Sequence, residues 1–196
     1  MIDFLIEIDK KIFLYLNNGS SLFDDFFVFI TNSTNMTLIT IPVIIYLVTK
    51  HQKKNKYLIL FCIFLTFILT DFIHFHAFKE VFQRLRPCWD PEISNACRVL
   101  VDKGGLYGFV SGHASNTVAL VSIIFFTFPN LKRWFKDILI IWAVVICYSR
   151  IYVGKHFPLD VIFGSLLGFI IAYIVFKLFF SHFVTKQRKN YGNQNI

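Results

Sequence analysis

Residues 57–78 read YLILFCIFLTFILTDFIHFHAF, and this nearly unbroken apolar run decides the class of fold. A helix that crosses the hydrocarbon core of a bilayer needs about 20 residues of this kind. The rest of the chain has the same character, since 56% of its 196 residues are hydrophobic and 18% are aromatic. Only 16% are charged, against about 25% in soluble domains. The composition therefore predicts an all-α membrane protein.

Apolar runs on either side of this segment predict the remaining helices, which we expect at residues 37–48, 113–128, 138–153 and 159–183. Residues 2–17 differ, because charged and apolar side chains alternate there with a helical period, which predicts an amphipathic helix lying in the membrane interface. Residues 22–49 fit either one bent span or two short helices. We therefore expect a multi-pass membrane helical bundle of five to six spans with an N-terminal amphipathic helix.

The chain divides into three parts along its length. Residues 1–35 are expected to form interfacial amphipathic and short helices, residues 36–185 the membrane domain that carries the polar motifs, and residues 186–196 a basic cytoplasmic tail. The first 18 residues do not resemble a cleavable signal peptide, because acidic side chains interrupt their apolar positions.

The net charge of +8 lies mostly in short loops and in the tail, as the positive-inside rule expects. This distribution argues against a nucleic-acid partner. By alternation, the lysine-rich loops and the tail fall on one side of the bilayer, which we assign to the cytoplasm. The polar motifs described next fall on the opposite, external side.

The first polar motif is Lys79, six further residues, then Arg86 and Pro87. If the helix continues through residue 86, both cations project from nearly the same face. Such a pair can bind an anion, although two solvated cations at a membrane surface are the more common case.

Ser111-Gly112-His113 is the second motif, at the start of an apolar helix. Free backbone N–H groups and the positive end of the helix dipole make this position an anion cradle. The alternative is a plain serine N-cap with no ligand.

The third motif is Ser149-Arg150, five residues, His156, three residues and Asp160. On a helix, His156 and Asp160 would share a face. A neutral imidazole is nucleophilic on one nitrogen when its other nitrogen donates to a carboxylate. The alternative is a surface histidine near a helix-starting aspartate. Arg150 is harder to explain that way, because an unpaired guanidinium in an apolar run is costly.

Other polar side chains have weaker signals. Asp71, His74 and His76 lie near the external end of their helix, and hydrogen bonding between helices is the favoured interpretation. Cys88 and Cys97 share one polar loop and can pair if it faces an oxidising compartment.

Together, the three motifs resemble those of the type 2 phosphatidic acid phosphatase superfamily of membrane lipid phosphatases, which includes undecaprenyl-diphosphate and phosphatidylglycerophosphate phosphatases. The resemblance covers about residues 57–180. Val110 departs from it, because the family usually has proline there.

The resemblance implies a role for each motif residue. His156 would be the nucleophile that becomes phosphohistidine, Asp160 would orient it, and His113 would be the general acid and base. The phosphate oxygens would be bound by Lys79, Arg86, Ser111, Gly112 and Arg150. Neither a metal nor another cofactor is implied.

We expect a hydrolase that removes phosphate from a membrane lipid, with the bilayer and that lipid as its only partners suggested by the sequence. Undecaprenyl diphosphate is our first expectation. Phosphatidylglycerophosphate, phosphatidic acid and lipid A are the alternatives, and a non-hydrolytic lipid-phosphate binder or translocator is the alternative of a different class. The expected location is the cytoplasmic (inner) membrane, with the site facing the periplasm or exterior. The oligomeric state is left open.

Overall fold

The computed structural model describes residues 2–51 and 55–185, and within them it is helical, with no strand. Its α-helices are α1 (Ile2–Asn17), α2 (Asp24–Thr31), α3 (Ser33–His51), α4 (Lys56–Ile73), α5 (Glu80–Phe82), α6 (Gly112–Thr127), α7 (Arg133–Tyr152) and α8 (Pro158–Val175). Two π-helices, His74–Lys79 and Phe176–Ser181, continue α4 and α8, and two 3-10 turns lie at Ser21–Phe23 and Pro87–Trp89.

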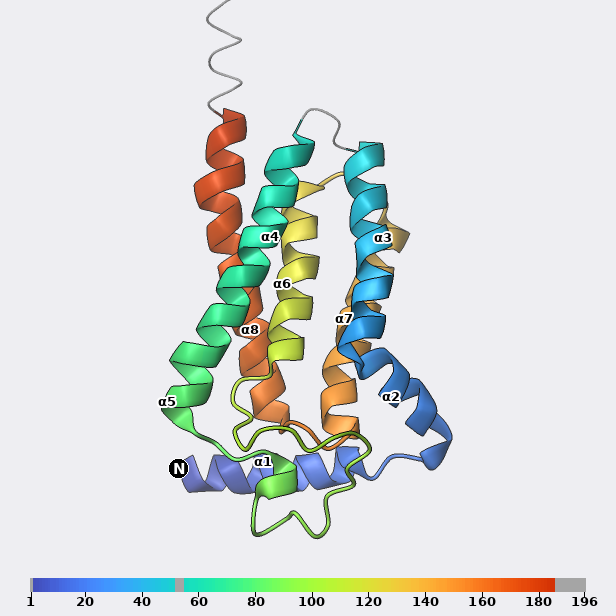
Figure 1. Ribbon diagram of the computed structural model, residues 1–196, viewed down its shortest axis with the longest axis vertical. Coiled ribbons are helices and arrows are strands. Elements are labelled where there is room, and N and C mark those ends of the chain that lie inside the picture. The colour runs from blue at the N-terminus through green and yellow to red at the C-terminus, as the bar shows by residue number, and fades with distance from the viewer. Residues whose placement is uncertain (1, 52–54, 186–196) are drawn as a thin grey trace, which may run out of the picture.

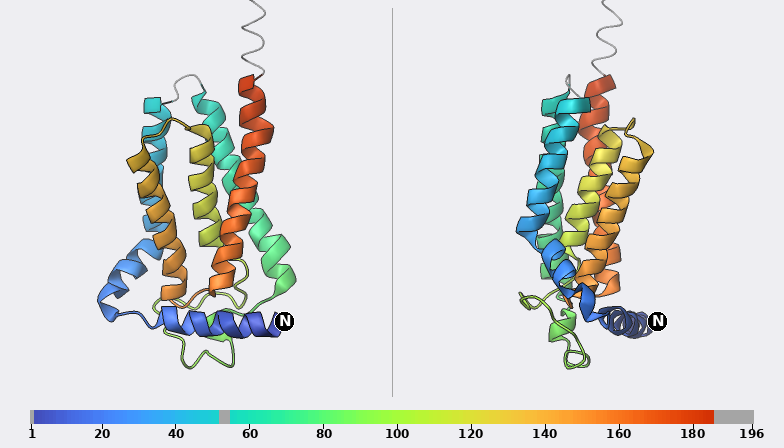
Figure 2. Two further views of the ribbon diagram at one scale, coloured as in Figure 1. Left: turned by 180° about the vertical axis from the view of Figure 1, so that it is seen from behind. Right: turned by 90° about the vertical axis from the view of Figure 1, so that its right-hand side faces the viewer.

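Five helices, α3, α4, α6, α7 and α8, run side by side as a bundle (Figures 1 and 2). The central helix is α6, which packs against α4, α7 and α8. Helix α1 lies across one end of the bundle, and the long loop between α5 and α6 covers the same end (Figure 1). The expected all-α fold is confirmed.

Three helical segments are long and apolar enough to cross a bilayer: Ser33–Lys50, Lys56–Phe82 and Pro158–Thr185. Helix α6 is apolar but shorter, and α7 carries charged residues at both ends. Large apolar side chains point outward from the bundle; Leu38 is 67% exposed and Phe64 is 64% exposed. Such an apolar surface is unfavourable in water and suits a lipid environment. The count of five to six spans stays a prediction.

Residues 22–49 form two separate helices, the short α2 and the longer α3, and α3 is long enough to cross a bilayer, so neither one bent span nor two short helices describes them fully. Helix α2 ends at Thr31, and α3 begins at Ser33. The Asn32 side chain between them accepts a hydrogen bond from the Thr34 N–H at 2.9 Å. This is the capping contact by which asparagine starts a new helix.

The expectation that Lys79 and Arg86 share a helix face is wrong. The helix ends at Phe82, and Gln83 adopts a left-handed conformation with φ 46°. The chain then runs against the loop before α6, where the Arg86 N–H donates to the Leu106 carbonyl at 2.9 Å. Arg86 therefore reaches its position from a loop.

His156 and Asp160 also do not lie on one helix, contrary to expectation, because α8 begins at Pro158. His156 follows a tight turn at Gly154, whose φ is 79°. A Cβ at Gly154 would lie 2.5 Å from the Arg98 carbonyl oxygen. The turn therefore requires glycine, and it sends the chain back into the bundle.

The four cysteines are free thiols in this structure, Cys88 and Cys97 included. The Cys88 thiol donates to the Lys103 carbonyl, and the Cys97 thiol to that of Gly154, both at 3.9 Å. The tail at residues 186–196 and the basic residues 53 and 54 lie outside the described residues.

Close packing of α6 on α8 depends on glycine. A Cβ at Gly168 would lie 2.1 Å from the Ser115 carbonyl oxygen and 2.9 Å from the Ala119 nitrogen. Small residues allow two helix backbones to approach in this way.

We therefore expect Gly168→Ala to separate α6 from α8 and to destabilise the protein by about 1–3 kcal/mol, the usual cost of overpacking. Thermal unfolding in detergent measures the effect. Gly105→Ala is the matched control, because its new methyl group meets nothing within 4 Å. Equal melting temperatures for the two variants would contradict this account of the packing.

Candidate active site

The three motifs meet at the end of the bundle that α1 covers (Figure 1). Lys79 ends the π-helix that follows α4, and Arg86 precedes the 3-10 turn. Gly112 and His113 open α6, Arg150 lies in the last turn of α7, and Asp160 lies in the first turn of α8. Each charged group is thus carried by a helix end or a loop beside it.

The site centres on His156, whose side chain is 3% exposed. Burial, followed by the positive charges of Arg86, Arg150 and Lys79, holds the pKa of His156 well below its usual range. The ring is therefore neutral at physiological pH, as a nucleophilic imidazole must be. His113 contributes to the same effect, so residues of all three motifs lie near the His156 ring.

Asp160 is fully buried, and its Oδ2 lies 3.6 Å from His156 Nδ1. That separation is too long for a hydrogen bond. The same oxygen accepts from the Phe157 N–H at 3.0 Å, while Oδ1 accepts from Arg84 at 2.8 Å. Among the described residues, His156 Nδ1 has no hydrogen-bond partner. Asp160 is placed beside the imidazole and held there by other groups.

His113 is oriented by the corner between α2 and α3. Its Nε2 lies 3.0 Å from the Thr31 carbonyl oxygen and 3.4 Å from Ser33 Oγ. A carbonyl oxygen only accepts, so Nε2 carries the proton in this arrangement.

Ser111 and Gly112 form the start of α6. The Ser111 hydroxyl accepts from the Ala114 N–H at 3.5 Å, so it is an N-cap. A Cβ at Gly112 would lie 2.8 Å from His74 Nε2. The Ser111 side chain therefore caps α6, and the anion cradle at these two residues stays a prediction.

Two arginines are buried at the site. Arg86 donates through Nε to the Tyr107 carbonyl at 3.1 Å, and burial is the main cause of its lowered pKa. Arg150, which is 5% exposed, donates through Nη1 to the Thr31 hydroxyl. Within the described chain, Arg150 Nε has no hydrogen-bond partner. A buried guanidinium with a free N–H suits a phosphate oxygen.

Sequence reasoning missed Lys155, a third buried cation in the same place. Lys155 is 7% exposed, and its ammonium donates to the Asp102 carbonyl. Burial, together with the charges of Arg86 and Arg150, lowers its pKa to about 8. The only signal for Lys155 in the sequence was its position next to His156. That signal is weak, because a lysine in a loop is normally solvated.

Thr31 and Arg84 were also missed. Thr31 binds His113 and Arg150, and Arg84 binds Asp160. Asp71, for which hydrogen bonding between helices was favoured, accepts from the Asn116 amide of α6 at 3.4 Å.

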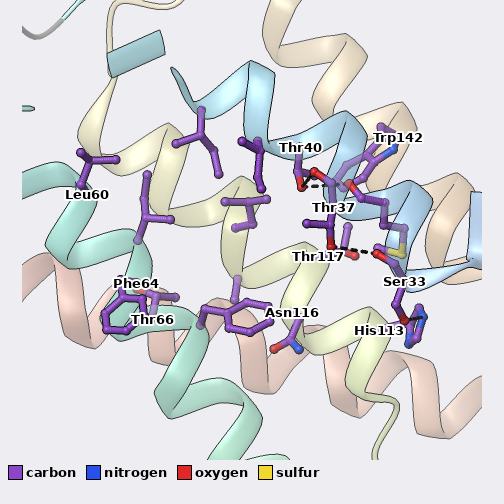
Figure 3. A pocket seen from close by; sticks show the side chains of 17 residues that line it. Ser33, Thr37, Thr40, Leu60, Phe64, Thr66, His113, Asn116, Thr117 and Trp142 are labelled. Atoms are coloured by element: carbon purple, nitrogen blue, oxygen red, sulfur yellow. Dashed lines mark hydrogen bonds between the residues drawn. The ribbon is translucent and has the colours of Figure 1, made fainter. Parts of the chain in front are cut away.

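An apolar groove of about 520 Å³ begins at His113 and runs between α3, α4 and α6. Ser33, His113 and Asn116 line one end, and Leu60 lies at the opposite end (Figure 3). Between them the walls are mostly apolar, with contributions from Met36, Ile41, Ile44, Phe64, Phe67 and Leu120. From Ser33 to Ile44, α3 rises by about 16 Å, so the groove suits a long hydrocarbon chain.

Comparison with known families gives one match over most of the chain. A sequence model of the PAP2 superfamily matches residues 56–183. A lipid A 4'-phosphatase from Porphyromonas gingivalis is 31% identical over 182 residues, which is 90% of this chain and 75% of that protein. An undecaprenyl-diphosphatase from Sulfolobus acidocaldarius is 38% identical over 96 residues, or 49% of this chain and 44% of that protein.

Two crystal structures have the same fold. Aquifex aeolicus LpxE superposes with a TM-score of 0.63 at 26% identity, covering 85% of this chain and 93% of LpxE. A PAP2-type phosphatidylglycerolphosphate phosphatase from Bacillus subtilis gives a TM-score of 0.65 at 22% identity, covering 87% and 84%.

The position of Lys155 predicts how activity depends on pH. If its charge helps to bind phosphate, kcat/KM falls as the pH rises through about 8, because the ammonium then loses its proton. We expect Lys155→Met to remove this basic limb and to lower kcat/KM at pH 7 by about tenfold, or 1.4 kcal/mol.

Lys103→Met is the control, since Lys103 lies over the Trp89 ring in the same loop region. Phosphate release from pH 6 to 10 provides the measurement. A basic limb that persists unchanged in Lys155→Met would assign it to another group.

Proposed function

The chain belongs to the PAP2 superfamily and is a lipid phosphatase, and we propose that it hydrolyses a phosphate monoester on a glycolipid of the lipid A class. The observation that carries this substrate is the similarity to lipid A 4'-phosphatases, which extends over 90% of the chain. A second such relative, from Bacteroides thetaiotaomicron, is 31% identical over 86% of the chain.

This proposal reverses the order of substrates expected from the sequence, where undecaprenyl diphosphate came first. The similarity to an undecaprenyl-diphosphatase covers only 49% of the chain. Undecaprenyl diphosphate stays the second candidate because identity within that shorter region reaches 38%.

A polar pair at the His113 end of the groove is proposed to contact the sugar of the substrate. Asn116 lines the groove beside His113, and its amide donates to Asp71. An uncharged sugar hydroxyl and its amide neighbours fit the same polar pair.

The proposed chemistry uses two displacements. In the first, the neutral His156 ring forms a bond from one nitrogen to phosphorus as the bond to the sugar oxygen breaks. His113, doubly protonated beside the bound phosphate with its Nε2–H on the Thr31 carbonyl, gives the sugar oxygen the proton of its other nitrogen and becomes neutral. In the second, water attacks phosphohistidine, and His113 takes the water proton, so that inorganic phosphate leaves and both histidines are restored.

The cations stabilise the charge that develops during these steps. Lys79, Arg86, Arg150 and the N-terminus of α6 are proposed to bind the phosphate oxygens. Preorganised donors in a site shielded from water are the largest usual contribution to such catalysis. Asp160 is proposed to orient His156.

We also propose how the protein sits in the membrane. The bundle helices α3, α4, α6, α7 and α8 cross the cytoplasmic membrane, α1 lies in its external interface, and the site faces the periplasm. The amphipathic pattern of α1 and its position across the bundle end support this arrangement.

The substrate is tested by phosphate release from purified protein in micelles, with EDTA present. We expect kcat/KM for bisphosphorylated lipid A to exceed that for undecaprenyl diphosphate and phosphatidylglycerophosphate by about tenfold or more, or 1.4 kcal/mol. His156→Ala should abolish release, whereas His182→Ala, at an exposed position beyond α8, should not. A tenfold preference for undecaprenyl diphosphate would overturn the substrate, and loss of activity in EDTA would overturn the metal-free mechanism.

The groove makes a separate prediction. Thr40 lies in its wall, and its hydroxyl donates to the Met36 carbonyl at 2.9 Å. We expect Thr40→Phe to raise KM for a lipid substrate by about tenfold (1.4 kcal/mol) and to leave hydrolysis of p-nitrophenyl phosphate unchanged.

Thr49→Phe is the matched control, because Thr49 is on the same helix, donates to the Ile45 carbonyl at 2.8 Å and lies outside the groove. If both variants change KM for the lipid equally, the groove does not hold the hydrocarbon chain.

A further inference from the structure

Asp9 is an unusual residue for a helix that lies on the outside of a bundle. Its side chain is 2% exposed, although residues 3–8 of α1 are exposed. Its Oδ2 accepts from Arg84 Nη2 at 2.6 Å, and its Oδ1 accepts from the Leu159 N–H at 3.0 Å. A buried carboxylate is costly unless it is paired in this way, so Asp9 fixes α1 against Arg84 and the start of α8.

Arg84 joins Asp9 to the candidate active site. Its Nη2 binds Asp9, and its Nη1 donates to Asp160 Oδ1 at 2.8 Å. The guanidinium also lies over the Phe157 ring, 4.3 Å from the ring centre. A planar guanidinium holds two carboxylates in a fixed relative orientation, which a lysine ammonium cannot do.

The contacts of Arg84 decide where Asp160 points. Asp160 Oδ1 accepts from Arg84, and Oδ2 accepts from the Phe157 N–H. These two hydrogen bonds keep the carboxylate from rotating. Its Oδ2 remains 3.6 Å from His156 Nδ1. A small shift of Asp160 toward His156 would allow a hydrogen bond to form. A small shift in the other direction would move the carboxylate out of reach of the imidazole.

The charges around Asp160 also matter. Arg84 faces it from the loop after α5, Asp9 from α1, His156 from the loop before α8, and the Arg86 side chain approaches it beside Gly108. If Arg84 served Asp160 alone, it would neutralise the carboxylate. Because Arg84 is shared with Asp9, its positive charge is divided between two carboxylates and does not cancel the charge of Asp160 alone.

We propose that Asp9 and Arg84 are positioning residues for the His156–Asp160 pair, so that the docked N-terminal helix is part of the machinery that prepares the nucleophile. Arg84 fixes the carboxylate of Asp160, and Asp9 shares the charge of Arg84. Neither residue is one of the motif positions. The inference rests on the proposed role of His156 and does not depend on which lipid is the substrate.

The test compares Asp9→Asn, Arg84→Met and the double variant. Arg84→Met leaves two buried carboxylates without the cation that they share, which favours the protonated form of Asp160. We expect kcat to fall by about 30-fold or more, with KM within about twofold, and the acid limb of the pH profile to move to higher pH. Asp9→Asn keeps the size of the side chain but leaves one oxygen to accept from either Arg84 or the Leu159 N–H, and it should lower kcat by about three- to tenfold.

The double variant separates positioning from folding. It removes both the guanidinium and the second carboxylate, so Asp160 ionises again. We expect its acid limb to return toward that of the wild type and its kcat to exceed that of Arg84→Met by about fivefold, a coupling that independent sites do not show. A purely structural role predicts losses that add, with no shift in the pH profile.

Hydrolysis of p-nitrophenyl phosphate serves as the assay, because it requires the histidine chemistry but no particular lipid. Lys11→Met is the control on α1, since Lys11 is exposed and, among residues 2–51 and 55–185, pairs only with Glu7. Thermal unfolding confirms that each variant is folded.

Calorimetric binding of orthovanadate, which copies phosphorus during transfer, provides a readout without turnover. We expect affinity to fall by about tenfold in Arg84→Met and to recover in the double variant. Unchanged kcat and vanadate affinity in Arg84→Met, or additive losses in the double variant, would overturn the proposal. If the wild type binds vanadate but hydrolyses no phosphate ester, the proposed function is overturned. The vanadate affinities of the wild type and the variants then still decide the role of Arg84.

Discussion

The concentration of positive charge around a buried histidine is the constraint on which the rest of this structure depends. Arg86, Arg150 and Lys155 are each less than 10% exposed, and Lys79 acts on the same imidazole. Cations in such surroundings repel one another and are poorly solvated. An anion that enters the site relieves both costs, so the arrangement favours phosphate binding at the expense of the stability of the empty protein.

Close contact between α6 and α8 gives this charged site its geometry. Gly164 and Gly168 bring the two backbones together, and the Ser111 N–H donates to the Asp160 carbonyl at 2.9 Å. The start of α6 and the start of α8 are therefore fixed to each other. Since His156 lies two residues before α8, the candidate anion cradle and the candidate nucleophile are positioned by one packing interaction between helices.

Polar and apolar parts of the molecule meet at His113. On one side lie the cations, and on the other lies the groove between α3, α4 and α6. The corner at Thr31 orients the His113 ring, so the short helix α2 affects both sides. A phosphate with a hydrocarbon chain can occupy both parts at once, which is the physical reason that a lipid phosphate suits this protein better than a soluble ester.

The sequence by itself determined the helical membrane character, through its long apolar runs, and the polar residues of the motifs, through their spacing. It could not show that Gln83 ends the helix in a left-handed turn or that Arg86 arrives from a loop, because both depend on contacts with residues near Tyr107. Only the tertiary structure joined Asp9, Arg84 and Asp160, which lie 75 and 76 positions apart along the chain. Local periodicity records which side chains are apolar; it does not record which buried charges become partners when distant helix ends meet.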